Sequence, residues 1–147
     1  MTTSVIRLLC GHRFVMQCNQ KRIPLIFFQD ATGFMVGTRA EQGGIIKDGA
    51  KLVNTVANSV VPTFTVVVGN SFGAANYALN GRAYDPRLML AWPSAQIAVM
   101  GGSQAAKTLL SIEERTLKKQ GIELSEEDRQ ARLDQIEARY TEQTSPV

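Results

Sequence analysis

The fold is decided by the stretch Val66–Tyr77, which reads VVVGNSFGAANY. Its three β-branched residues indicate a buried strand, which we expect over Thr63–Val68. Small residues follow over Gly69–Ala75, and Tyr77-Ala78-Leu79 reads as the first turns of a helix that ends at Asn80-Gly81. A strand that runs through small residues into a helix leaves backbone N–H groups unpaired at the start of the helix. Such groups can hold a developing negative oxygen, and small side chains let a ligand reach them.

The same letters have two other interpretations. Gly69–Gly73 matches G-x-S-x-G, the nucleophile elbow of serine hydrolases, with Ser71 as the nucleophile. That fold places its histidine after the serine, whereas the single histidine of this chain, His12, precedes Ser71. The remaining interpretation is a tight turn with no chemistry. From the residues alone, an oxyanion pocket and a plain turn are equally well supported, and a serine nucleophile is disfavoured.

The composition is that of one globular domain. The chain has 147 residues, of which 44% are hydrophobic and 20% charged, enough to form a core. The net charge of +3 is uneven, because residues 1–110 contain ten basic and four acidic side chains and residues 111–147 contain six and nine. No basic run is interleaved with aromatic residues, so we expect no nucleic-acid partner. No apolar run is long enough to predict a membrane span.

The cysteines indicate a reducing compartment and no metal site, and the amino-terminal segment is a candidate targeting segment. Cys10 and Cys18 form no C-x-x-C motif, and with one histidine in the chain we expect no metal site and two buried free thiols. Residues 1–22 contain basic residues and no acid, as mitochondrial targeting segments do. The apolar Phe14-Val15-Met16 favours a helix of the domain instead.

Helix and strand signals alternate along the first hundred residues. Residues 1–10 are left unassigned. The other expected elements are a helix ending over Gly11–Lys21, a buried strand over Ile23–Phe28, a long helix over Glu41–Ser59, the strand Thr63–Val68, and short strands over Leu88–Trp92 and Ala95–Met100. This alternation predicts an α/β fold with parallel strands.

Two further glycine-rich segments are candidate ligand contacts. The loop Gly33–Gly37 carries Phe34, Met35 and Val36, which is too apolar for a plain solvent loop, so it folds over a ligand or packs against another chain. Gly43-Gly44 is a second place where backbone amides could meet an anion.

The last third of the chain predicts a helical hairpin over residues 102–143. Its first helix opens at Gly101-Gly102-Ser103 and stops at Gly121. Its second opens at the capping box of Ser125 and Asp128. We expect its apolar stripe of Leu133, Ile136 and Tyr140 to pack on the body or on a partner subunit.

Several separate motifs, taken together, resemble one known family. They are Ile23-Pro24-Leu25, Thr32–Gly37 (TGFMVG), Gln42–Leu52 (QGGIIKDGAKL), Gly73–Tyr77 (GAANY), Gly81–Arg87 (GRAYDPR) and Val99–Gly102 (VMGG). They resemble the carboxyltransferase (β) subunits of biotin-dependent acyl-CoA carboxylases, and the TGFMVG and GRAYDPR forms look most like the methylcrotonoyl-CoA branch. The resemblance runs from about Gly11 to Val147 and leaves residues 1–10 outside.

The resemblance implies a fold, a reaction and a site. The fold is crotonase-like, a spiral of ββα units, of which this chain is a partial domain. The reaction is transfer of a carboxyl group from carboxybiotin to an acyl-CoA such as 3-methylcrotonoyl-CoA, in leucine or branched-chain catabolism, by an enzyme of the ligase class. The backbone amides of Ala74 and Ala75 are the implied oxyanion hole for the biotin ureido oxygen. The implied biotin side of the site is Gly33, Phe34, Gly43, Gly44 and Gly73.

The resemblance also implies partners and a compartment. Biotin is carried on a partner biotin carboxylase or carrier subunit, coenzyme A enters as part of the substrate, and carboxyltransferase subunits form dimers or hexamers. The expected compartment is the cytoplasm in a bacterium and the mitochondrial matrix in a eukaryote. Because family members are much longer and hold the acyl-CoA on another domain, we expect this polypeptide alone to be inactive. The alternative within the fold is an acyl-CoA hydratase or isomerase, for which Glu41 and Asp48 are the nearest carboxylates.

Overall fold

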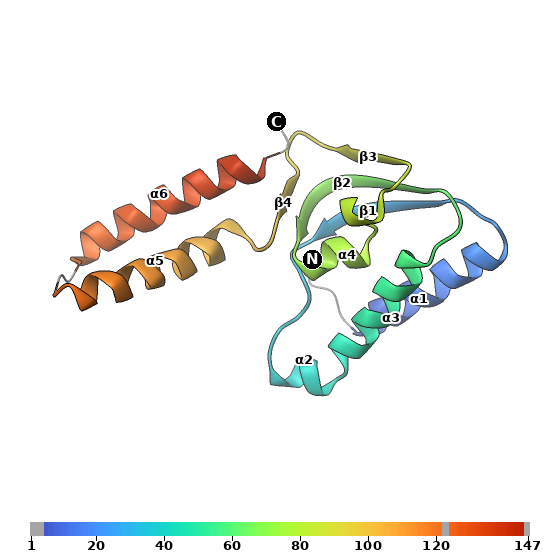
Figure 1. Ribbon diagram of the computed structural model, residues 1–147, viewed down its shortest axis with the longest axis horizontal. Coiled ribbons are helices and arrows are strands. Elements are labelled where there is room, and N and C mark those ends of the chain that lie inside the picture. Colours follow the sequence, from blue (N-terminus) through green and yellow to red (C-terminus); the bar gives the residue numbers. More distant parts are fainter. Residues whose placement is uncertain (1–4, 122–123, 146–147) are drawn as a thin grey trace. The chain divides into compact units, whose positions relative to one another are not determined.

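The computed structural model describes residues 5–121 and 124–145, and these residues form two compact units, one up to residue 99 and one from residue 100 onward. Figure 1 shows the elements of both. The first unit contains α1 (Val5–Gln20), β1 (Leu25–Ala31), α2 (Thr38–Gln42), α3 (Ile45–Ala57), β2 (Thr63–Phe72), α4 (Ala74–Ala78), a 3₁₀ turn (Arg82–Tyr84), β3 (Leu88–Ala91) and β4 (Gln96–Ala98). The second contains α5 (Gly102–Lys119) and α6 (Glu126–Thr144).

The sheet is parallel throughout, as the alternation of helices and strands predicts. β2 lies at its centre and pairs with β1 on one edge, from Leu25 opposite Thr63 to Ala31 opposite Ser71. On the other edge of β2, β3 pairs with Phe64–Val67 and β4 with Asn70–Phe72. Both β1 and β2 therefore reach their carboxyl ends at the same edge of the sheet.

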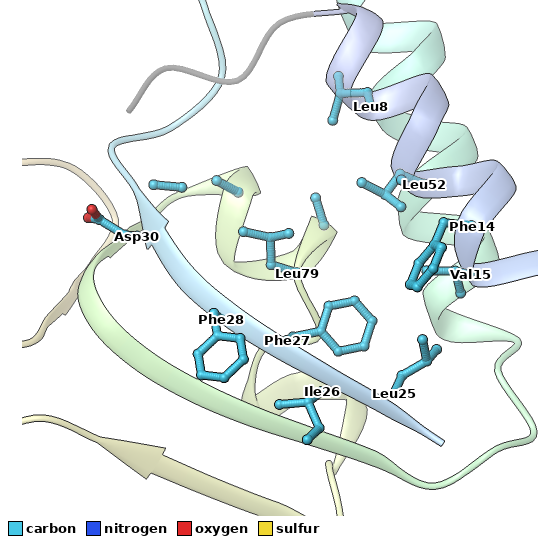
Figure 2. Close-up of a pocket in the computed structure, with 14 residues that line it drawn as sticks. Leu8, Phe14, Val15, Leu25, Ile26, Phe27, Phe28, Asp30, Leu52 and Leu79 are labelled. Atoms are coloured by element: carbon cyan, nitrogen blue, oxygen red, sulfur yellow. The ribbon is translucent and has the colours of Figure 1, made fainter. Parts of the chain in front are cut away.

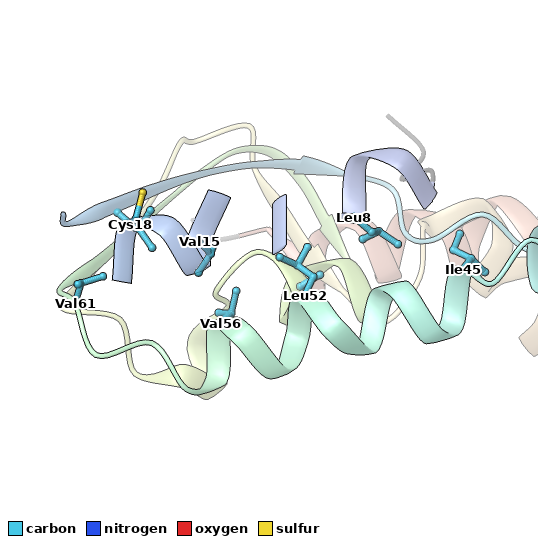
Figure 3. Close-up of a cluster of buried hydrophobic side chains, with 9 residues drawn as sticks. Leu8, Val15, Cys18, Ile45, Leu52, Val56 and Val61 are labelled. Carbon is cyan, nitrogen blue, oxygen red and sulfur yellow. The ribbon is translucent and has the colours of Figure 1, made fainter. Parts of the chain in front are cut away.

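Helices cover one face of this sheet. The core lies between α1 and α3 (Figure 3), because both helices turn an apolar stripe inward. Its buried members are Leu8, Val15 and Cys18 of α1, Ile45, Leu52 and Val56 of α3, and Leu25, Val61 and Ala78. Cys18 is thus a buried free thiol as expected, whereas Cys10 is exposed, which corrects the expectation of two buried thiols.

The other face of the sheet is open within the described residues of the first unit, so the expectation of a buried first strand holds for one face of β1 only. Ile26 and Phe28 are 62% and 67% exposed. The register lines them up with Phe64 and Val66 of β2 and with Leu88 and Leu90 of β3. Parallel sheets normally bury both faces, and the described helices of the first unit cover only one.

Several element boundaries differ from the sequence expectation, among them that of β1, which runs over Leu25–Ala31 instead of Ile23–Phe28. The expected helix Glu41–Ser59 is two helices, since Gly44 adopts a left-handed conformation with φ 86° and separates α2 from α3. The central strand continues to Phe72, because β4 pairs with Asn70–Phe72. α4 begins at Ala74, three residues before the expected Tyr77. The segment left unassigned, residues 1–10, is helical from Val5 onward, and residues 1–4 lie outside the described range.

The second unit is the expected antiparallel pair of helices. Ser125 caps α6, since its hydroxyl accepts from the N–H of Asp128 at 3.1 Å. Arg129 pairs with Glu114 at 2.6 Å, and Arg132 pairs with Glu113, which joins the two helices. Tyr140 donates to the carbonyl oxygen of Met100 at 3.1 Å, so the expected stripe on α6 is partly buried at this end.

Candidate functional site

The turn from β2 into α4 presents two backbone amides side by side. Gly73 makes the turn with φ 56° and ψ −136°, a conformation that only glycine adopts without strain. Its N–H donates to the carbonyl oxygen of Ala98 on β4 at 3.0 Å, and its carbonyl oxygen accepts from the N–H of Asn76 at 3.1 Å. Ala74 and Ala75 lie between these two fixed residues.

The amides of Ala74 and Ala75 are free of acceptors within the described residues. Among the backbone hydrogen bonds of turns, loops and helix ends, donors include Gly73 and Asn76 but neither of the two alanines between them. Ala74 is exposed, and Ala75 is 1% exposed. Two neighbouring free N–H groups can donate to one anionic oxygen. α4 has only five residues, so this capacity comes from the amides themselves and not from a long helix dipole.

An apolar cavity of about 400 Å³ borders Ala75 (Figure 2). Its lining comes from α1, β1, α3 and α4, and the labelled side chains of Phe14, Phe27 and Leu79 are among those drawn around it. Asp30 is the only charged residue among the described residues that line it. Of the site residues expected from sequence, only Ala75 lines this cavity.

The loop after β1 leaves the sheet at the same edge as this turn, because Ala31 pairs with Ser71. Ligands of open α/β sheets bind outside the carboxyl ends of the strands, so Gly33 and the turn at Gly73 lie where a shared ligand would be expected. Phe34, however, packs on the core beside Gly49 of α3. Met35 and Val36 are the exposed members of the loop, at 45% and 91%.

Gly43 and Gly44 do not offer the amides that the sequence suggested. The N–H of Gly43 donates to the carbonyl oxygen of Arg39 at 3.0 Å, and that of Gly44 to the carbonyl oxygen of Glu41 at 3.0 Å. Both donors are therefore used inside the turn between α2 and α3. Next to this turn, the N–H groups of residues 45–47 in the first turn of α3 have no acceptor among the described residues.

Ser71 is placed as a structural hydroxyl and not as a nucleophile. It is 1% exposed, donates to Oε1 of Gln29 at 2.5 Å and accepts from Nδ2 of Asn76 at 2.8 Å. His12 lies on α1, where Nδ1 bonds to the hydroxyl of Thr55 at 2.5 Å. The hydrolase interpretation therefore lacks its serine–histidine contact.

The carboxylates of the hydratase alternative are also occupied or remote from the cavity. Asp48 is 8% exposed and pairs with Lys51 at 2.8 Å, whereas Glu41 is exposed on α2. Neither residue lines the cavity beside Ala75. Tyr84 lies edge-on to Tyr77 of α4, with ring centroids 6.2 Å apart. The pKa of Tyr84 is raised, mainly because the side chain is partly buried and secondarily because Tyr77 lies nearby.

Gln29 and Asn76 are residues of this site that sequence reasoning missed. Gln29 is 0% exposed and occupies the face of β1 that also carries Leu25 and Phe27. A polar residue at an inward position of an apolar strand was the available signal, because a buried amide needs partners. Asn76 gave no such signal.

Over the described ranges, no cluster of histidine, cysteine or acidic side chains is arranged to hold a metal ion. The same residues include no helix that meets the length and apolarity of a membrane span.

The fold and site define the chain as part of a crotonase-like α/β domain that presents backbone amides at the carboxyl edge of a parallel sheet. The carboxyl transferase domain family matches residues 9–147, and the chain belongs to that family. The match begins two residues before Gly11, where the sequence resemblance was expected to start.

Individual relatives agree with this assignment. The chain is 49% identical to the mitochondrial methylcrotonoyl-CoA carboxylase beta chain of Arabidopsis thaliana, over 94% of this chain and 24% of that protein. It is 46% identical to the biotin-dependent 3-methylcrotonyl-coenzyme A carboxylase beta1 subunit of Mycobacterium tuberculosis, over 94% of this chain and 26% of that protein. The beta subunit of P. aeruginosa geranyl-CoA carboxylase superposes with a TM-score of 0.83 at 37% identity, over 97% of this chain and 26% of that one. The chain thus spans about a quarter of the length of these relatives.

Proposed function

We propose that this chain supplies the biotin side of the carboxyltransferase site in a biotin-dependent acyl-CoA carboxylase. The observation that carries the proposal is the pair of neighbouring amides on Ala74 and Ala75, which have no acceptor within the described residues. Family membership indicates the class of reaction. Two adjacent N–H donors suit the single ureido oxygen of biotin, and the apolar cavity beside Ala75 suits a hydrocarbon ring system.

Carboxybiotin, when bound, supplies carbon dioxide and then a basic ureido nitrogen, with negative charge on the ureido oxygen. The role of this chain is to stabilise that charge. The amides of Ala74 and Ala75 donate to the oxygen, and one such donor lowers a barrier by about 3 kcal/mol. The apolar lining limits water around these bonds, which strengthens them. No side-chain acid or base of this segment is needed, consistent with the occupied hydroxyl of Ser71.

The biotin side of the site would be lined or shaped, from the same edge of the sheet, by Gly33, Phe34 and Gly73. Gly43 and Gly44 would contribute by positioning the first turn of α3, because their own N–H groups donate to carbonyl oxygens of the turn.

The acyl acceptor proposed for the complete enzyme is 3-methylcrotonoyl-CoA or a related branched acyl-CoA, since the plant and mycobacterial relatives carry that name. The enzyme would be a ligase of leucine degradation, with biotin on a carrier subunit and carboxyltransferase subunits joined as a homo-oligomer. The open apolar face of the sheet supports such an association. The compartment would be the mitochondrial matrix in a eukaryote, as the name of the plant relative states for that protein, and the cytoplasm in a bacterium.

Biotin methyl ester tests the site directly, since its ureido ring is intact and its carboxylate is masked. We expect titration of the ¹⁵N-labelled chain to shift the amide resonances of Ala74 and Ala75 downfield. The matched probe is the 2-imino analogue, in which an N–H replaces the ureido oxygen, and it should leave both resonances in place. Equal shifts with both probes, or none with either, would contradict the proposal.

A further inference from the structure

A set of buried and half-buried side-chain hydrogen bonds ties α4 to the strands β1 and β2. The hydroxyl of Ser71 on β2 donates to Oε1 of Gln29 on β1 at 2.5 Å and accepts from Nδ2 of Asn76 on α4 at 2.8 Å. Nε2 of Gln29 donates to the carbonyl oxygen of Leu79, the C-cap residue directly after α4, at 2.6 Å. One pair of strand residues therefore bonds to α4 at its middle residue and at the residue that follows the helix.

Gln29 and Ser71 are buried, Asn76 is half-buried, and the side-chain polar groups of the two buried residues are hydrogen bonded. Gln29 is 0% and Ser71 1% exposed, and no buried side-chain polar atom among the described residues lacks a partner. Burying amide and hydroxyl groups is unfavourable unless they are hydrogen bonded. Apolar side chains could hold α4 on the sheet without needing hydrogen-bond partners. What hydrogen bonds add is direction, because they weaken steeply when donor and acceptor are misaligned.

Because these hydrogen bonds fix the direction of α4, they also fix the direction of the free amides of Ala74 and Ala75. Asn76 follows Ala75 directly, and its own N–H bonds back to the carbonyl oxygen of Gly73 at 3.1 Å. The peptides of Ala74 and Ala75 are thus enclosed between Gly73, which is held by β4, and Asn76, which is held by Ser71. If the backbone at Asn76 rotated, the peptide groups of Ala74 and Ala75 before it would change direction.

We propose that Gln29, Ser71 and Asn76 are positioning residues that aim the amides of Ala74 and Ala75. This inference rests on the proposed function, in which those amides hold the ureido oxygen. Donors stabilise an oxyanion only when they are already oriented toward it, so a small error in the direction of α4 lowers binding without removing any donor.

The test compares Ser71→Ala and Asn76→Ala with Thr65→Val. Thr65 is a matched control, because it is also a buried hydroxyl of β2, 1% exposed, and donates to the carbonyl oxygen of Asn80 beyond the end of α4 at 2.7 Å. All three variants should lower the melting temperature. Only the first two should weaken biotin methyl ester binding, by about fivefold, the effect of one misdirected hydrogen bond. Asn76 is partly exposed and helical, so Asn76→Ala should fold even if Ser71→Ala does not.

A second readout separates this inference from the proposed function. Backbone order parameters of the Ala74 and Ala75 amides should be near 0.85 in the wild type and fall toward about 0.6 in Ser71→Ala and Asn76→Ala, but not in Thr65→Val. If the wild type does not bind the probe, the proposed function fails, and these order parameters still decide the positioning role. Unchanged order and binding in Asn76→Ala, or equal losses in Thr65→Val, would overturn it.

Discussion

The N–H of Gly73 donates a 3.0 Å hydrogen bond to the carbonyl oxygen of Ala98, which fixes the turn after β2 to strand β4. A methyl group on Gly73 would lie 3.0 Å from the carbonyl oxygen of the next residue of that segment, Val99. The positive φ and the close carbonyl oxygen therefore both favour glycine at this position. The two free amides of Ala74 and Ala75 follow directly from it.

Gly73→Ala should destabilise the first unit by about 1–3 kcal/mol, because alanine must adopt a positive φ and press on a carbonyl oxygen. Urea unfolding measures this cost. Gly11→Ala is the control, since Gly11 lies inside α1 and an added methyl would meet Leu52 at an ordinary 3.5 Å. It should stabilise the chain by about 0.5–1 kcal/mol. Equal effects of both substitutions would contradict the assigned turn.

Ala74→Pro should remove one donor and leave the fold in place. Ala74 is the first residue of α4, where proline is tolerated because its N–H has no helical acceptor. We expect binding of biotin methyl ester to weaken by about 3- to 10-fold, the value of one hydrogen bond. Ala74→Gly keeps the amide and should bind as the wild type does. Retained affinity in a folded proline variant would exclude the Ala74 amide from the site.

Gly49→Ala should be destabilising, although helix propensity alone predicts a gain of about 1 kcal/mol inside α3. A Cβ atom at Gly49 would overlap the ring of Phe34, which packs there against the core. Displacing the ring should cost about 1–3 kcal/mol. Combining Gly49→Ala with Phe34→Ala should cost less than the sum of the single changes, as unfolding of the four species measures. Additive costs would mean that the two residues do not contact.

Phe28→Thr should reduce self-association while leaving stability within about 0.5 kcal/mol, because Phe28 is 67% exposed on the open face of the sheet. Leu25→Ala is the contrast on the same strand. Leu25 is 4% exposed and belongs to the core, so its loss should cost about 2–5 kcal/mol. Sedimentation velocity and urea unfolding report the two properties separately. A large loss of stability in Phe28→Thr would show that this face is covered in solution.

Sequence patterns predicted the parallel α/β layering and the hairpin helices well. Helical and strand periodicities depend on local spacing, and Ser125 caps α6 through a contact only three residues away. The family followed from several short motifs with fixed order. Boundaries that depend on distant pairing were predicted less well, as at Asn70–Phe72, which stays in the strand because β4 lies beside it.

By itself the sequence indicated most of the helices and strands, that the strands run parallel, and that small residues follow the central strand. The tertiary structure alone decided which amides are available. Gly43 and Gly44 donate within their own turn, whereas Ala74 and Ala75 do not. It also decided that Ser71 bonds to Gln29, a partner on a neighbouring strand. Hydrogen-bond partners far apart in the chain are chosen by how strands pair and helices pack, and no local pattern of residues encodes that choice.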